Sequence, residues 1–161
     1  MAPKLLIIGL DCAEPSLMFE QWREELPHLA GLMARASYGR LESCTPAITV
    51  PAWSCMMSGR DPGELGIYGF RNRASREYGA MAVADSRSVQ VPRLWDYLGA
   101  AGWRVAVIGV PGTYPPPEVH GALVSCFLAP STATTYTHPP ALAETIAALF
   151  PAPSPQPPAP S

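Results

Sequence analysis

Apolar and polar segments alternate along the chain in a way that predicts strands separated by helices. Short apolar runs bounded by polar residues are typical of buried strands, and they occur at residues 4–10, 38–44, 103–110 and 122–128. Apolar residues at helical spacing predict helices that begin near Glu14 and Pro51 and that cover residues 27–36, 92–101 and 141–150. Strands that alternate with helices favour an α/β fold with a mostly parallel sheet and helices on both faces.

Proline, glycine and polar residues mark the connections and the last part of the chain. Residues 59–69 are loop-like and contain a D-P-G turn signal, and residues 71–90 form a polar stretch. Residues 151–161 are more than half proline, which predicts an extended, disordered tail. The predicted organisation is therefore one domain over residues 1–150 followed by the tail at 151–161.

Composition narrows the classes of protein to which the chain can belong. Its 161 residues, 48% hydrophobic and 15% charged, are enough for one domain with a buried core. A net charge of −2 gives no basic face for nucleic acid, although a bound metal would still allow a phosphate-ester substrate. The apolar run at residues 5–10 is too short for a membrane span or a signal peptide. The four widely spaced cysteines favour reduced thiols in a cytoplasmic protein.

Two residues stand where chemistry is expected, and each has two interpretations. Asp11 follows the first predicted strand, so its carboxylate either caps the next segment or binds a divalent metal at the sheet edge. Thr49 precedes a predicted helix start, so its hydroxyl is either an N-cap or a nucleophile. A threonine nucleophile needs a base or a metal for activation, and the spacing alone does not decide between these interpretations.

Several ordered blocks over residues 4–150 resemble the type I phosphodiesterase/nucleotide pyrophosphatase group of the alkaline-phosphatase superfamily, in its branch of predicted phosphohydrolases and phosphomutases. The blocks are LLIIGLDCAEPS, LPHLAGLMARASYGRLES, TPAITVPAWSCMMSGRDPGELGIYGF and a later stretch with GVPGTYPP at 109–116. In that pattern an aspartate ends the first strand, and a threonine in a T-x-P context stands ten residues before a glycine. The matching positions here are Asp11, Thr49, Pro51 and Gly59.

The resemblance implies an alkaline-phosphatase-like fold and a metal-dependent phosphohydrolase that acts through a phospho-threonine intermediate. Asp11 and Thr49 would bind metal, Thr49 would be the nucleophile, and the family as a whole would use two zinc or manganese ions. Asn72 is a candidate substrate-binding residue, because it lies near the position of a phosphate-contacting asparagine in the nucleotide pyrophosphatases. Phosphate-ester small molecules are the implied substrates, and the oligomeric state stays open.

The sequence departs from the family pattern at four positions. Cys12 and Cys126 stand where glycine is expected, and Leu65 replaces a histidine. Phe70 occupies the position of the asparagine, so that Asn72 is two residues out of register, which disfavours nucleotide substrates. The sulfatase alternative needs C-x-P-x-R. Neither Cys44-Thr45-Pro46 nor the segment that begins at Thr49 is followed by the required arginine, so phosphoryl transfer is favoured.

The remaining metal ligands of the family are aspartates and histidines that this sequence does not supply. It has no aspartate after Asp96, and none of its histidines, His28, His120 and His138, belongs to a D-x-x-x-H motif. We therefore expect the chain to be an N-terminal portion of such an enzyme, inactive by itself and marginally stable. The alternative is a non-catalytic α/β module, derived from that family, which binds a partner or a small anion.

Overall fold

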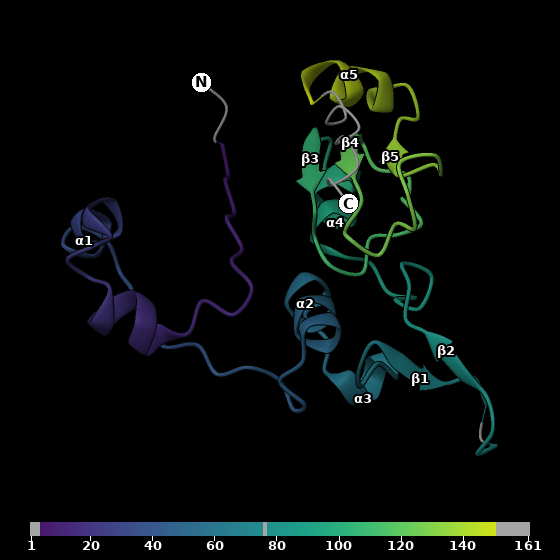
Figure 1. The fold of residues 1–161 in the computed structure, drawn as a ribbon, viewed down its shortest axis with the longest axis horizontal. Coiled ribbons are helices and arrows are strands. Elements are labelled where there is room, and N and C mark those ends of the chain that lie inside the picture. Colours follow the sequence, from purple (N-terminus) through teal and green to yellow (C-terminus); the bar gives the residue numbers. More distant parts are fainter. Residues whose placement is uncertain (1–3, 76, 151–161) are drawn as a thin grey trace, which may run out of the picture. The chain divides into compact units, whose positions relative to one another are not determined.

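The computed structural model describes residues 4–75 and 77–150, which fall into two compact units divided between Ser43 and Cys44 (Figure 1). The tail predicted at residues 151–161 lies outside the described residues.

The first unit is helical and contains no strand among its described residues. It holds one turn of π-helix, η1, at Leu17–Gln21, and one α-helix, α1, at Pro27–Met33, with Pro27 in its first turn. The strands predicted at 4–10 and 38–44 were wrong, because neither segment pairs with a neighbour. A strand needs a second strand for its ladder hydrogen bonds, and this unit offers none. Residues 4–10 keep an apolar surface, with Leu6 81% exposed.

The second unit carries the remaining elements. Its helices are α2 (Thr49–Ser58), α3 (Pro62–Leu65), α4 (Leu94–Ala100) and α5 (Leu142–Leu149). Its strands are β1 (Arg71–Arg73), β2 (Met81–Val83), β3 (Val105–Ile108), β4 (Gly121–Val124) and β5 (Thr137–His138). The predicted helices at 92–101 and 141–150 and the predicted strand at 103–110 are confirmed with narrower bounds. The strand predicted at 122–128 is confirmed as β4, which begins one residue earlier and ends four residues earlier.

Two predicted loops of this unit contain regular structure. In the loop at 59–69, the Asp61 carboxylate accepts the backbone N–H of Glu64 at 2.9 Å, and this capping box starts the short helix α3. The polar stretch at 71–90 contains the antiparallel hairpin of β1 and β2, in which Asn72 lies opposite Ala82. Strands of three residues are too short to leave a periodic pattern in a sequence, so this hairpin gave no signal.

The larger sheet has the strand order β3-β4-β5, which confirms the α/β class. Strands β3 and β4 are parallel, with Val105 opposite Gly121, whereas β4 and β5 are antiparallel, with Leu123 opposite His138. The connection between β4 and β5 is long enough to reverse direction, and the short β5 ends the sheet. The pair β3/β4 is the parallel nucleus that the alternation of strands and helices predicted.

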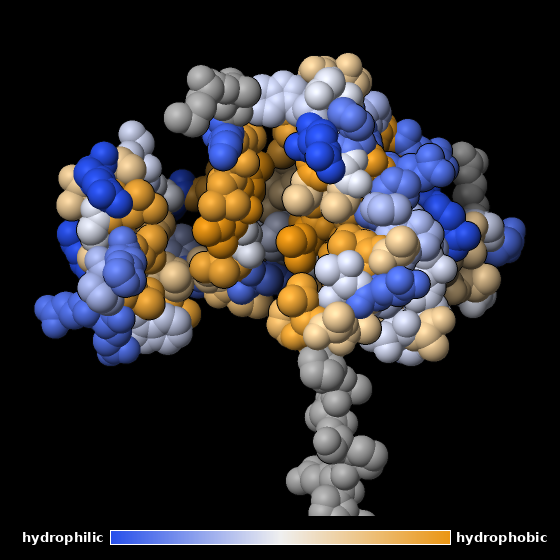
Figure 2. Space-filling view, turned by 90° about the horizontal axis from the view of Figure 1, so that it is seen from above, coloured by the Kyte–Doolittle hydropathy of each residue, from blue (hydrophilic) through white to orange (hydrophobic). Residues whose placement is uncertain are grey.

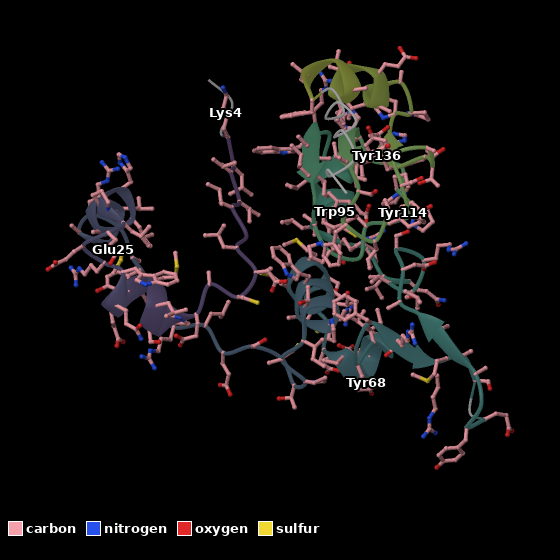
Figure 3. The ribbon with its side chains drawn as sticks, in the orientation of Figure 1. Lys4, Glu25, Tyr68, Trp95, Tyr114 and Tyr136 are labelled. Atoms are coloured by element: carbon pink, nitrogen blue, oxygen red, sulfur yellow. The ribbon has the colours of Figure 1, made fainter. Side chains whose placement is uncertain are left out.

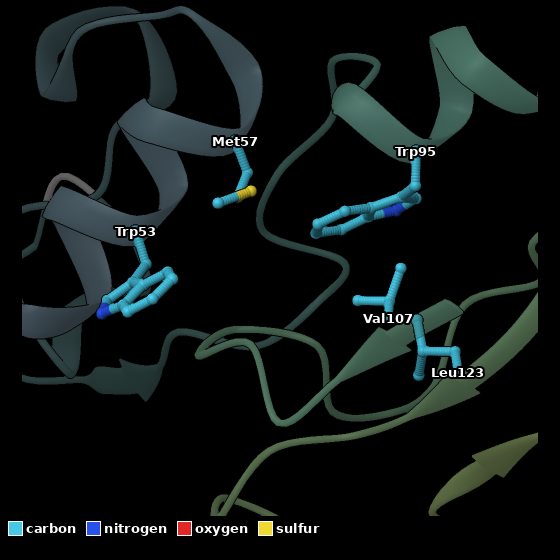
Figure 4. Close-up of a cluster of buried hydrophobic side chains, with 5 residues drawn as sticks. All are labelled: Trp53, Met57, Trp95, Val107 and Leu123. Atoms are coloured by element: carbon cyan, nitrogen blue, oxygen red, sulfur yellow. The ribbon is translucent and has the colours of Figure 1, made fainter. Parts of the chain in front are cut away.

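The core lies on one face of this sheet (Figure 4). Trp53 and Met57 of α2 and Trp95 of α4 point toward Val107 and Leu123 on the strands. Leu123 is fully buried and Val107 is 7% exposed, whereas the next residue on β3, Ile108, is 74% exposed. Side chains alternate across a strand, so α2 and α4 cover the Val107 face, while Ile108 lies on the opposite face. Apolar side chains also reach the surface elsewhere (Figure 2).

Gly121 permits the close approach of the two parallel strands. Its φ is +150°, and a Cβ at this position would lie 2.0 Å from the carbonyl oxygen of Val105. The neighbour is backbone, so it cannot move aside without breaking the register of β3 and β4. Only glycine fits here, because it has no Cβ.

We expect Gly121→Ala to lower the free energy of unfolding by about 3 kcal/mol or more, since strain and overpacking add. Urea unfolding followed by tryptophan fluorescence measures the change. Gly69→Ala is the matched control, because its Cβ would meet only the Arg71 carbonyl oxygen at 3.8 Å. Equal unfolding midpoints for the two variants would contradict the proposed backbone clash.

Candidate functional site

Thr49 is the first residue of α2 and not its N-cap. The N-cap is Ile48, whose backbone is extended, with φ −121° and ψ 146°, and whose side chain cannot cap. The helix therefore begins two residues before Pro51. The first turn of a helix tolerates this proline, because a backbone N–H at that position would have no partner within the helix. The glycine ten residues after Thr49 also has a structural role, since Gly59 ends the helix with φ +69°.

The first turn of α2 presents free polar groups. Among the residues that the structure describes, the Thr49 hydroxyl and the backbone N–H groups of Thr49 and Val50 have no hydrogen-bond partner. Ala52 donates its N–H to the carbonyl oxygen of Ile48 at 2.9 Å. Unpaired N–H groups and the helix dipole make a helix N-terminus a favourable place for an anion such as a phosphoryl group. The Thr49 side chain is partly buried, so it is accessible to a small molecule.

Two apolar clusters hold this helix in place. Val50 is 1% exposed and packs with Ile67, Ala84 and Val89. Trp53 and Met57, three and seven residues later and therefore on the same face of the helix, belong to the cluster on β3 and β4. Both clusters hold this face of α2 and so fix the helix that carries the Thr49 hydroxyl.

The loop at residues 109–116, whose sequence resembles a block of the family, lies against α2. A Cβ on Gly112 would come within 3.8 Å of the hydroxyl oxygen of Ser54, which α2 buries. Thr113 is fully buried and donates its hydroxyl to the carbonyl oxygen of Val110 at 2.6 Å. Ser86 holds the far end of the loop, with its N–H bonded to the carbonyl oxygen of Tyr114 at 2.8 Å. Gly112, Thr113 and Tyr114 of this loop therefore have structural roles.

The buried residues Ser54, Thr113 and Ser86 were missed by the sequence reasoning. Their polar side chains carry no periodic signal, and each is buried by segments distant in the sequence. For Thr113 the sequence offered one hint, which is its position in a loop rich in glycine and proline. Threonine hydroxyls in such loops often form hydrogen bonds to the nearby backbone.

Asp11 lies in a turn of the first unit and is exposed. Its Oδ1 accepts the backbone N–H of Cys12 at 3.1 Å. Cys12 has φ +59°, a left-handed conformation that favours glycine, which explains why glycine suits that position. Cys126, the other departure from glycine, has no positive φ and is 3% exposed. Asp11 belongs to the first unit, whereas Thr49 belongs to the second.

Asn72 uses both ends of its side chain within its own loop. Its Oδ1 accepts the backbone N–H of Tyr68 at 2.8 Å, and its Nδ2 donates to the carbonyl oxygen of Gly69 at 3.1 Å. Tyr68 lies between α3 and β1 (Figure 3). In this structure, Asn72 therefore ties the turn that leads into β1.

The described residues do not fit a metal centre by themselves. Over residues 4–75 and 77–150, no group of three or more His, Cys, Asp or Glu side chains is placed to hold a metal ion. His28 is exposed on α1, and His138 lies in β5. The Nδ1 atom of His120 lies 2.9 Å from the carbonyl oxygen of Trp103. A two-metal centre would therefore need further ligands.

The fold defines an α/β protein with a free threonine hydroxyl at a helix start. The family model described as type I phosphodiesterase / nucleotide pyrophosphatase matches residues 5–155. The chain therefore belongs to this family of phosphoric ester hydrolases, which is part of the alkaline-phosphatase superfamily. No curated protein and no solved structure matches it. None of the helices among the described residues is long and apolar enough to cross a membrane.

We expect Asn72→Ala to destabilise the turn before β1 by about 1–2 kcal/mol, because the N–H of Tyr68 and the carbonyl of Gly69 lose their partners. Amide hydrogen exchange of Tyr68 measures local opening. Asn72→Asp is the control, since it keeps the acceptor for Tyr68. Equal exchange of Tyr68 in wild type and Asn72→Ala would contradict this role.

Proposed function

We propose that this protein acts in phosphoric ester hydrolysis, with Thr49 as the nucleophile that accepts the phosphoryl group. The observation that supports this proposal most is the position of Thr49 at the start of α2, where its hydroxyl has no hydrogen bond to any of the described residues. Membership of the family supports the reaction class. In the proposed reaction, the Thr49 oxygen bonds to phosphorus, the alcohol leaves, and water then hydrolyses the phospho-threonine.

The protein's own residues contribute binding and orientation in this proposal. The unpaired N–H groups of Thr49 and Val50 point out of the helix start and would donate to the phosphoryl oxygens. The rigid packing of Val50 and Trp53 would keep the nucleophile in one place. Asn72 would contact substrate only after releasing Tyr68 and Gly69.

Asp11 is proposed as a metal ligand, with zinc or manganese as the metals of the family. Carboxylate oxygen suits either ion. Because the described residues bring no three ligands together, a complete centre needs donors besides Asp11 and Thr49.

Thr49→Val tests the nucleophile directly. We expect hydrolysis of bis(4-nitrophenyl) phosphate in the presence of Zn²⁺ or Mn²⁺ to be weak or absent, because the described residues bring together no complete set of metal ligands. Thr49→Val should lower any such turnover to background, because the covalent step is lost. Thr45→Val, four residues earlier and exposed, is the matched control. A Thr49→Val variant as active as wild type would exclude Thr49 as the nucleophile.

A non-catalytic binding module is the second candidate function, and the lack of a clustered ligand set among the described residues favours it. Titration with Zn²⁺ followed by calorimetry separates the two. The module hypothesis expects weak binding, unaffected by Asp11→Asn, and no turnover. Tight binding of two ions that Asp11→Asn weakens at least about tenfold, together with turnover, would exclude the module.

A further inference from the structure

The hairpin of β1 and β2 carries two cations and two apolar side chains on one face. Arg71 lies opposite Val83, and Arg73 lies opposite Met81. Residues directly opposite each other in an antiparallel pair point to the same side, and so do residues two apart along one strand. Arg71, Arg73, Met81 and Val83 therefore share one surface, which we call the hairpin face. Asn72, between the two arginines, points to the other side.

The hairpin face is open to solvent. Met81 is 58% exposed and Val83 is 57% exposed, and both arginines are exposed as well. Over residues 4–75 and 77–150, neither Arg71 nor Arg73 forms an ion pair with a carboxylate. Tyr78, in the loop that joins the strands, is 89% exposed, and the Arg73 guanidinium lies 4.1 Å from the centre of its ring. Cations and apolar side chains thus lie together on an exposed surface.

The base of the hairpin is fixed, so the two strands present this face from a stable support. Ala84 directly follows β2, is 3% exposed and belongs to the cluster that contains Val50. Its backbone N–H donates to the carbonyl oxygen of Phe70, the residue before β1, at 2.9 Å. Figure 1 shows the hairpin extending from the side of α3.

We propose that the hairpin face binds the surface of a membrane that contains anionic lipid. Such a surface presents negatively charged headgroups above apolar acyl chains, so guanidinium groups and apolar side chains on one face both find partners there. The apolar stem of an arginine lets its guanidinium stay among the headgroups while neighbouring apolar side chains insert. Tyrosine, like Tyr78 in the loop, is enriched at this depth of a membrane.

The distribution of charge supports the same partner. Residues 71–83 contain three arginines and one glutamate, whereas the chain as a whole has a net charge of −2. The attraction to an anionic surface is therefore local to the hairpin, and it orients the chain with this segment toward the lipid.

Two other partners fit the hairpin face less well. A nucleic acid is bound through a broad basic surface, and it would leave Met81 and Val83 against phosphate groups. A second copy of this chain would cover the apolar side chains, but the same face on both copies would bring the arginines of one close to the arginines of the other. Anionic lipid satisfies both kinds of side chain at once.

Co-sedimentation of the full-length chain with lipid vesicles tests the proposal. We expect binding to vesicles of equal parts phosphatidylserine and phosphatidylcholine to be at least about tenfold stronger than to phosphatidylcholine alone, because each arginine near an anionic surface contributes about fivefold. Raising the ionic strength from about 0.01 M to about 0.15 M should weaken this binding, because salt screens the attraction. Equal binding to both kinds of vesicle, or binding to neither, would overturn the proposal.

Variants locate the binding on the hairpin face. Arg71→Gln with Arg73→Gln should weaken binding at least about tenfold, whereas lysine at both positions should keep it, since the lipid surface attracts either cation. Met81→Gln leaves the charge unchanged and should weaken binding at least about threefold through lost apolar burial. The matched control is Arg35→Gln with Arg104→Gln, which removes the same charge at exposed positions outside the hairpin. An equal loss in this control would overturn the proposal.

Two further measurements separate the remaining explanations. Urea unfolding followed by tryptophan fluorescence should give the same midpoint for each variant as for the wild-type chain, since every substituted side chain is exposed. Gel filtration without lipid tests the second copy: a dimer that Arg71→Gln with Arg73→Gln dissociates would overturn the proposal in favour of self-association. Lipid binding is measured without turnover, so its outcome is independent of the role proposed for Thr49.

Discussion

The packing of α2 between two apolar clusters is the constraint on which the second unit depends. Trp53 and Met57 connect this helix to the parallel pair β3/β4, and Val50 connects it to the cluster that holds the segment around Val89. A helix of this length gains little stability from backbone propensity alone, so tertiary packing must supply most of it. The same two contacts fix where the helix begins, and therefore where the Thr49 hydroxyl lies.

The parallel pair in turn depends on one close backbone approach. Gly121 lets the carbonyl oxygen of Val105 occupy the space that a Cβ would fill, and the buried residues Val107 and Leu123 follow in the same register. A parallel pair with only one covered face leaves apolar side chains such as Ile108 exposed. The candidate site is thus supported by a small core whose geometry is set by backbone contacts as much as by side chains.

The sequence by itself determined the α/β class, the family, and the main helices and strands of residues 92–150. These elements have strong apolar periodicity, and the family blocks are long and ordered. Residues 59–69 were predicted as a loop, although the spacing of Asp61 and Glu64 matches the capping box that starts α3. The prediction from the sequence failed at residues 4–10. An apolar run predicts a strand there, but it cannot supply the neighbouring strand with which it would have to pair.

Only the tertiary structure decided the roles of single residues. The sequence left Thr49 open between a cap and a nucleophile, and the extended backbone of Ile48 showed that Thr49 is not the cap. The local hydrogen bonds of Asn72 were likewise invisible in the sequence. The physical reason is that periodicity reports which side chains are buried, whereas a site depends on which atoms meet across turns and packed elements.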